Sequence, residues 1–198
     1  MEQLGKQERS KKRIEVILDT AETILLEKGQ DAITFANISK YSGLKRTSTY
    51  KFFPTTDALK LLMVSRYLEE CENQFAIKSS NIKTKQLSVI VLRSVEILFE
   101  FFNQSQGAQL LILKNTITPS TPSKSIHGLS LKMQSFIELN INLPEMFNKE
   151  GVFRVNTQII LSIFALNTKE SGSLNEVGKI EAHRASHAYL LNWVNQNN

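Results

Sequence analysis

The chain has 198 residues, of which 41% are hydrophobic and 22% charged, so it can bury a core without a disulfide or a metal staple. A lone cysteine, Cys71, excludes an intramolecular disulfide, and no apolar run approaches the roughly 20 residues that span a membrane. The polar start has no apolar segment of the kind that a secretory signal needs, so we expect a cytoplasmic protein without membrane association.

The net charge of +5 is concentrated near the N-terminus. Residues 1–13 carry five basic and two acidic side chains, and residues 36–60 carry five basic side chains and one acidic side chain. These two segments hold more than the whole excess of positive charge, so the remainder is close to neutral. Local basic patches indicate contact with a polyanion, and a solubilising surface is the alternative reading.

The first predicted element is a helix over residues 10–28, which follows a basic polar arm at residues 1–9. Its apolar residues recur at the i, i+3, i+4, i+7 spacing of one buried stripe. Gly29 stands where a glycine is expected to end a helix. Thr34 is expected to cap a second helix of about two turns, which ends at Gly43.

The next predicted helix covers about residues 45–52 and is stopped by Pro54. Either Thr55 or Thr56 can cap a fourth, longer helix with its hydroxyl. A short helix, a glycine turn and another short helix have the spacing of a helix-turn-helix, which here covers residues 34–53.

Beyond a polar junction at residues 78–86 the sequence becomes strongly apolar. No alternating strand pattern is sustained anywhere, so the predicted fold class is all-α. The further predicted helices cover residues 87–102, 107–117, 126–140, 154–168 and 174–194, with a Pro/Ser loop at 118–125 and a turn at 171–173.

The first 70 residues resemble the N-terminal domain of the tetracycline-repressor-like (TetR) family. The matching segments are RIEVILDTAETILLEKG (13–29), ITFANISKYSGLKRTSTYKFFPTTDAL (33–59) and the helix that follows, over about a third of the chain. The resemblance implies a DNA-binding domain at residues 10–78. It implies a helical ligand-binding and dimerisation domain at residues 79–198.

The resemblance also implies how such a protein works. The third helix would enter the major groove of double-stranded DNA, and two symmetric heads would read a palindromic operator with half-sites about 34–36 Å apart. The homodimer would be held by helices at about 154–168 and 174–195. A small-molecule effector in the C-terminal domain would release this repressor from its operator, provided that it binds the two conformations unequally.

The predicted DNA contacts lie in and around the helix-turn-helix. Arginine and lysine can bind guanine edges or phosphate, and hydroxyls and helix N-termini suit phosphate. We expect contacts from Thr34, Lys45, Arg46, Thr47, Ser48, Tyr50, Lys51, Thr55, Thr56 and Lys60. Basic residues 9–13 either reach an adjacent minor groove or form a solvated tail.

Three of these positions depart from the family pattern. Lys45 stands where the family often has Ser or Thr, Thr47 where it often has Gly, and Thr56 where a Lys commonly opens the fourth helix. The last change removes one usual phosphate contact, which Lys60 or the neighbouring hydroxyls would replace. We therefore expect an unusual operator sequence.

The C-terminal domain holds seven of the eleven phenylalanines. An apolar cavity lined by some of them is the predicted effector pocket, and plain core packing is the alternative for each. Because the apolar helices contain few charges, we expect a small apolar or aromatic ligand. The candidate pocket residues are Phe99, Phe102, Phe136 and Phe164.

Motifs of catalysis are absent from the sequence. There is no G-x-S-x-G elbow, no phosphate-binding G-x-x-x-x-G-K and no metal-spaced set of cysteines. His183 and His187 share a helix face at a spacing that can bind a metal, but no third ligand accompanies them. We expect no enzyme, no catalytic residue, no metal and no cofactor. The alternatives are a small all-helical enzyme or a protein-interaction module with a basic N-terminus.

Overall fold

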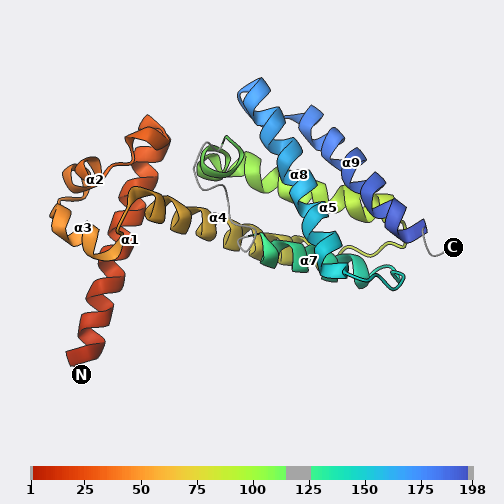
Figure 1. The fold of residues 1–198 in the computed structure, drawn as a ribbon, viewed down its shortest axis with the longest axis horizontal. Coiled ribbons are helices and arrows are strands. Elements are labelled where there is room, and N and C mark those ends of the chain that lie inside the picture. The colour runs from red at the N-terminus through yellow and green to blue at the C-terminus, as the bar shows by residue number, and fades with distance from the viewer. Residues whose placement is uncertain (1, 115–125, 196–198) are drawn as a thin grey trace. The chain divides into compact units, whose positions relative to one another are not determined.

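The computed structural model describes residues 2–114 and 126–195, and all the regular structure in these ranges is helical (Figure 1). The all-α prediction is therefore confirmed. The chain divides into two compact units, residues 1–63 and 64–198. The division falls inside helix α4 (Thr56–Ser79), whereas the predicted domain boundary at residues 78/79 coincides with the end of that helix.

The first helix, α1 (Glu2–Lys28), is longer than the sequence pattern indicates. Residues 2–9 continue the helix, so they do not form the separate arm that was predicted. The physical reason is that this segment is rich in Glu, Gln, Lys and Arg, which favour helix even where no apolar stripe anchors it. The predicted stripe itself is buried, with Ile17, Ala21 and Ile24 at most 1% exposed.

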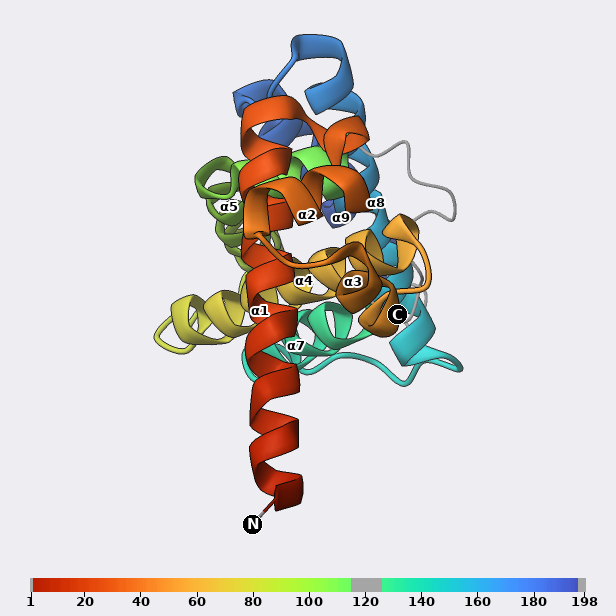
Figure 2. The same cartoon turned by 90° about the vertical axis from the view of Figure 1, so that its left-hand side faces the viewer.

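The first unit is completed by a 3-10 turn η1 (Gln30–Ala32), α2 (Phe35–Ser42), α3 (Arg46–Phe52) and the start of α4. The short helix α2 packs on α1, and α3 packs on α2 (Figure 2). Their shared core is small, because few residues are available to fill it. It contains Ile33, Phe35, Ile38, Phe53 and Leu59, with the stripe of α1.

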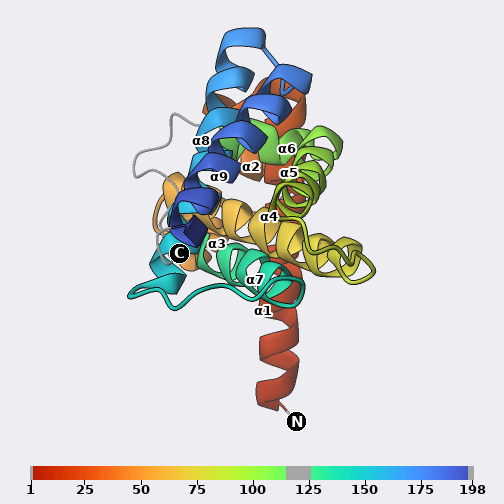
Figure 3. The same ribbon diagram turned by 90° about the vertical axis from the view of Figure 1, so that its right-hand side faces the viewer.

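The second unit contains the rest of α4, then α5 (Leu87–Gln104), α6 (Gln106–Ala108), a π-helical turn η2 (Gln109–Leu113), α7 (His127–Glu138), α8 (Lys149–Ser171) and α9 (Glu176–Asn195). Helices α8 and α9 pack side by side, and α9 also packs on α5 (Figure 3). Helix α7 packs on α8. Within the described ranges no helix has both the length and the apolar character needed to cross a bilayer.

In the segment predicted as one helix at 107–117, the described residues form α6 followed by the π-helical turn, and residues 115–117 lie outside the described ranges. The Lys114 N–H donates to the Gln109 carbonyl, five residues back, at 2.8 Å. The Gln109 side chain also makes two longer-range hydrogen bonds: its Nε2 donates to the Phe102 carbonyl at 2.9 Å, and its Oε1 accepts from the Leu174 N–H at 3.3 Å. One glutamine thus ties the end of α5 to the turn before α9. The predicted loop at 118–125 lies outside the described residues.

Helix α8 begins five residues earlier than predicted, at Lys149 rather than 154. Gly151 occupies the first turn. The Asn148 side chain caps this turn by accepting a hydrogen bond from the Gly151 N–H at 3.1 Å. A Cβ at residue 151 would collide with the Asn148 side chain, so the cap requires glycine at this position.

Glu72 on α4 reaches the start of α7, where its carboxylate accepts a hydrogen bond from the Leu129 N–H. Burial raises the pKa of this carboxyl, and the Lys132 ammonium opposes the shift. A folded-state pKa above the unfolded value means that ionising Glu72 costs more in the folded protein. That cost is present above the folded pKa and disappears below the unfolded one.

Glu72→Gln removes this ionisation cost. We expect the unfolding free energy of the variant, relative to the unsubstituted protein, to rise as the pH increases from about 4 to about 7. Urea denaturation of both proteins at the two pH values measures the difference. Glu69→Gln, at an exposed position on the same helix, is the control. A difference for Glu72→Gln that does not change with pH would contradict the inferred cause.

Candidate nucleic-acid interface

The helix-turn-helix begins at Thr34, which is the N-cap of α2 as predicted. Its backbone is extended, and its Oγ1 accepts a hydrogen bond from the Asn37 N–H at 3.2 Å. Asn37 is held in turn by a 2.8 Å hydrogen bond from its Nδ2 to the Ala32 carbonyl. Thr34 is exposed, so the start of α2 is open to solvent and to a phosphate.

The turn between α2 and α3 depends on Gly43. Its φ of 69° lies in the left-handed region that favours glycine, and its N–H donates to the Ser39 carbonyl at 3.1 Å. The Leu44 N–H then donates to the Ser42 hydroxyl at 3.1 Å. These local bonds direct the chain into α3 at Arg46, within one residue of the predicted start.

Helix α3 has one buried side and one exposed side. Thr49 is fully buried, and Phe53, which follows the helix, is 5% exposed. The opposite side carries most of the predicted DNA contacts. The exposed residues on it are Lys45, Arg46, Thr47, Tyr50 and Lys51, and Ser48 is half-buried.

The cations of this exposed side form no ion pair within residues 2–114 and 126–195. Among the described residues, no carboxylate lies within ion-pairing distance of Lys45, Arg46 or Lys51. Three neighbouring cations without a counter-charge are a poor way to stabilise a fold. They are well suited to binding an external polyanion.

Tyr50 combines an anchored ring with an accessible hydroxyl. Its ring packs edge-on against Phe35 of α2, with ring centroids 4.6 Å apart, while 57% of the residue stays exposed. The ring contact restricts the side chain and positions its hydroxyl for an external hydrogen bond.

The start of α4 resolves the choice between Thr55 and Thr56. The Thr55 Oγ1 accepts from the Ala58 N–H at 3.1 Å, so Thr55 is the cap and Thr56 is the first helical residue. Thr55 is exposed, and Thr56 and Lys60 are half-buried. All ten predicted DNA-binding residues therefore belong to the first compact unit.

A basic and aromatic cluster near this surface was missed by sequence reasoning. The Lys28 ammonium donates to the Tyr41 hydroxyl, and this hydrogen bond, together with the charge of Lys28, lowers the pKa of Tyr41. The Lys40 ammonium lies 5.8 Å from the centre of the same ring. Because Lys28 and Tyr41 are 13 residues apart, only the packing of α2 against α1 reveals the pair.

Three of the four predicted ligand-binding phenylalanines form one cluster. Phe102 and Phe164 are fully buried with ring centroids 6.2 Å apart, and Phe99 contacts the Phe164 ring at 6.3 Å. The Lys179 ammonium lies over the Phe99 ring at 5.1 Å. These contacts are those of a packed core.

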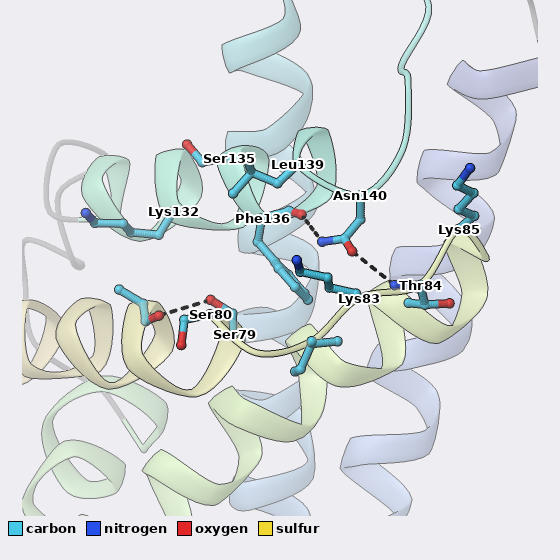
Figure 4. Close-up of a pocket in the computed structure, with 12 residues that line it drawn as sticks. Ser79, Ser80, Lys83, Thr84, Lys85, Lys132, Ser135, Phe136, Leu139 and Asn140 are labelled. Atoms are coloured by element: carbon cyan, nitrogen blue, oxygen red, sulfur yellow. Dashed lines mark hydrogen bonds between the residues drawn. The ribbon is translucent and has the colours of Figure 1, made fainter.

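Phe136, the fourth, lines a cavity of about 690 Å³ in the second unit (Figure 4). Its ring also packs edge-on against Phe75, with centroids 5.9 Å apart. The cavity lies between the end of α4, the segment 80–86 and α7. Its lining residues are Ala76, Ser79, Ser80, Ile82, Lys83, Thr84, Lys85, Lys132, Ser135, Phe136, Leu139 and Asn140.

The residues that could support other chemistry are accounted for by packing. Cys71 is fully buried in α4, and burial raises the pKa of its thiol far above the usual value. His183 and His187 stack with centroids 5.9 Å apart, and the His183 Nε2 lies 3.1 Å from the Ser88 carbonyl. The described part of the chain has no group of three or more His, Cys, Asp or Glu side chains that could hold a metal ion.

No family model matches the sequence, and no curated protein is similar enough in sequence to count as a relative. The structure, in contrast, is similar to solved structures. A TetR-family transcriptional regulator from Streptomyces coelicolor superposes with a TM-score of 0.69 at 16% identity, over 91% of this chain and 99% of that one. A protein from Mesorhizobium loti assigned to the same family superposes with a TM-score of 0.58 at 16% identity, over 93% and 96% of the two chains.

The chain therefore has the fold of the TetR-family transcriptional regulators. The similarity covers both compact units, so the resemblance seen in residues 13–59 extends to the C-terminal helices.

Proposed function

We propose that this protein is a DNA-binding transcriptional regulator of the one-component type. The observation that carries the proposal is the exposed side of α3, where Lys45, Arg46 and Lys51 have no carboxylate partner among the described residues. Helix α3 would enter the major groove. There Arg46 or a lysine would bind guanine, and Thr47 and Ser48 would touch neighbouring base edges.

The surrounding residues would hold the helix on the duplex. The open N-termini of α2 and α4 would receive phosphates through Thr34, Thr55 and Thr56, and the Tyr50 hydroxyl would add another contact. Lys60 would take the role of the missing lysine at Thr56. Such contacts set the register on the duplex, and the base contacts of α3 set the sequence preference.

The active form is proposed to be a homodimer on a palindromic operator in the cytoplasm. Support comes from large apolar side chains that remain exposed on α8 and α9. Within each helix two of them are 11 residues apart, which is three turns, so they share one face. These residues are Val155 (45% exposed) and Leu166 (56%) on α8, and Val177 (62%), Ile180 (47%) and Leu191 (38%) on α9.

Leu166→Glu should convert this homodimer to a monomer. Both subunits of a two-fold symmetric dimer carry the substitution, so the interface would bury two carboxylates. An unpaired buried carboxylate is strongly unfavourable. Sedimentation velocity at micromolar concentration measures the assembly. Ile77→Glu, at a 72% exposed site on α4, is the matched control and should remain dimeric. A monomeric unsubstituted protein would overturn the dimer proposal.

The C-terminal unit is proposed to bind a small apolar or aromatic effector that releases the repressor from DNA. Among the four predicted pocket residues, Phe136 supports this role because it lines the cavity. The effector must bind the DNA-free conformation more tightly than the DNA-bound one, since equal affinity shifts nothing.

Fluorescence anisotropy with the duplex that flanks the gene of this protein tests the proposed function. We expect tight binding that scrambled duplex of equal length does not reproduce, and a steep loss of affinity with salt. Each phosphate contact should contribute about 0.9 to the slope of log affinity against log salt. Equal affinity for flanking and scrambled DNA, or affinity without salt dependence, would contradict the proposal.

A further inference from the structure

The cavity between α4, the segment 80–86 and α7 is lined by positive charges only. Lys83, Lys85 and Lys132 line it, and none of its lining residues is acidic. Within the described residues, Lys83 and Lys85 have no carboxylate within ion-pairing distance. Lys132 interacts electrostatically with Glu72, which lies outside the lining. The cavity is therefore positively charged and lacks a counter-charge of its own.

Lys83 is the central cation of this cavity. In Figure 4 its side chain extends from the segment 80–86 alongside Phe136, whereas Lys132 and Lys85 lie toward opposite ends of the view. A ligand placed against Phe136 would meet the Lys83 ammonium first. The other two lysines would add a weaker, longer-range attraction.

The backbone N–H groups on both sides of Lys83 donate hydrogen bonds that hold its segment in place. The Thr84 N–H donates to the Asn140 Oδ1 at 3.0 Å, and the Asn140 Nδ2 donates to the Phe136 carbonyl at 2.9 Å. The Ile82 N–H donates to the Ser79 carbonyl at 3.1 Å. The cation is thus attached to a fixed backbone on both sides, which reduces the ordering cost of binding.

The rest of the lining is apolar or neutral. Ala76, Ile82, Phe136 and Leu139 supply apolar surface, and Leu139 is 85% exposed. A bare inorganic anion would leave this surface in contact with water. A neutral apolar molecule would leave the Lys83 ammonium without a partner. The combination suits a ligand with an apolar body and one negative group.

We propose that this cavity binds a small organic carboxylate with an aromatic or aliphatic body. The carboxylate accepts hydrogen bonds from Lys83, and the body packs on Phe136 and Leu139. Naming this carboxylate as the effector rests on the proposed function of the protein as a regulator. Binding of the carboxylate itself requires only the cavity.

Benzoate, benzamide and inorganic phosphate are suitable probes because they separate charge from apolar body. Two-dimensional amide NMR titrations of the full chain measure their binding. We expect saturable binding of benzoate, with shifts confined to the lining residues, and at least tenfold weaker binding of benzamide and of phosphate. No saturable binding of benzoate, or equal binding of benzamide or phosphate, would overturn the assignment.

Variants locate the site. Lys83→Ala should weaken benzoate binding about tenfold, because a hydrogen bond to a charged group is removed, and Lys83→Arg should retain most of the affinity. Leu139→Ser should weaken it to a smaller extent. Lys169→Ala, at an exposed site on α8, should have no effect. Equal affinity in the Lys83→Ala and Lys169→Ala variants would overturn the role of Lys83.

The DNA assay separates this inference from the proposed function. If the protein binds benzoate but does not bind the flanking duplex specifically, the carboxylate site is established and the regulator proposal is refuted. Specific DNA binding in a protein that does not bind benzoate would refute the carboxylate site alone. Where both hold, benzoate should lower the affinity for DNA in the unsubstituted protein and not in the Lys83→Ala variant.

Discussion

Replacing Lys45 and Lys51 together with alanine is expected to weaken binding to the operator roughly 100-fold at moderate salt. Both side chains are exposed on or beside α3 and pair with no carboxylate among the described residues, so their charges are available to DNA. For the same reason the substitutions should leave the thermal midpoint nearly unchanged. The weaker binding would then report DNA contact rather than unfolding.

The salt dependence distinguishes two kinds of contact. If both lysines touch phosphate, the slope of log affinity against log salt becomes shallower by about 0.9 for each phosphate contact that the DNA-binding unit loses. The preference for the operator sequence is then retained. If one binds a guanine edge, the variant also loses preference at one operator position. Lys169→Ala with Arg184→Ala removes the same charge from exposed sites of the second unit that lie outside the cavity, and is the control. Equal effects of the two double variants on affinity would show that α3 does not touch the DNA.

Replacing Phe164 with alanine is expected to lower the free energy of unfolding by about 3–5 kcal/mol. Phe164 is fully buried on α8, and its ring contacts Phe99 and Phe102 of α5. The deletion would therefore leave a cavity between two main helices of the second unit. Chemical denaturation at a fixed protein concentration measures the destabilisation, since a dimer has a concentration-dependent midpoint.

Phe147→Ala is the matched control for Phe164→Ala. Phe147 is fully exposed before the start of α8, so its replacement should change the unfolding free energy by less than about 0.5 kcal/mol. Similar effects of the two substitutions would contradict the assigned core. A large destabilisation by Phe164→Ala identifies the cluster of Phe99, Phe102 and Phe164 as structural, and it leaves Phe136 as the predicted pocket residue that faces a cavity.

Much of the first unit could be predicted because its signals are local. The hydroxyls of Thr34 and Thr55 cap the residues that immediately follow them, and Gly29 and Gly43 both adopt positive φ where the chain leaves a helix. Each of these choices involves atoms within a few residues. The apolar stripe of α1 is also periodic in sequence, which is why its buried residues were predicted correctly.

The errors in predicted helix bounds arose where apolar periodicity was the guide. Residues 2–9 of α1 have no apolar stripe, and their helix-favouring composition was given too little weight. The predicted start of α8 followed the apolar run that begins at residue 154, whereas the Asn148 cap starts the helix five residues earlier. The π-helical turn begins at Gln109, whose side chain has a partner, Leu174, that is 65 residues away.

The sequence by itself determined the all-helical class and the helix-turn-helix, and it named the side chains that are proposed to contact DNA. Capping, glycine conformation and helical periodicity all involve residues that are close in sequence, so they can be predicted from short stretches of the sequence. Only the tertiary structure decided which phenylalanines are core, which one faces a cavity, and that three lysines surround that cavity. The burial of a side chain and the charges around it depend on segments that are distant in sequence, such as α4 and α7. No local sequence pattern shows that these two helices lie close together in the fold.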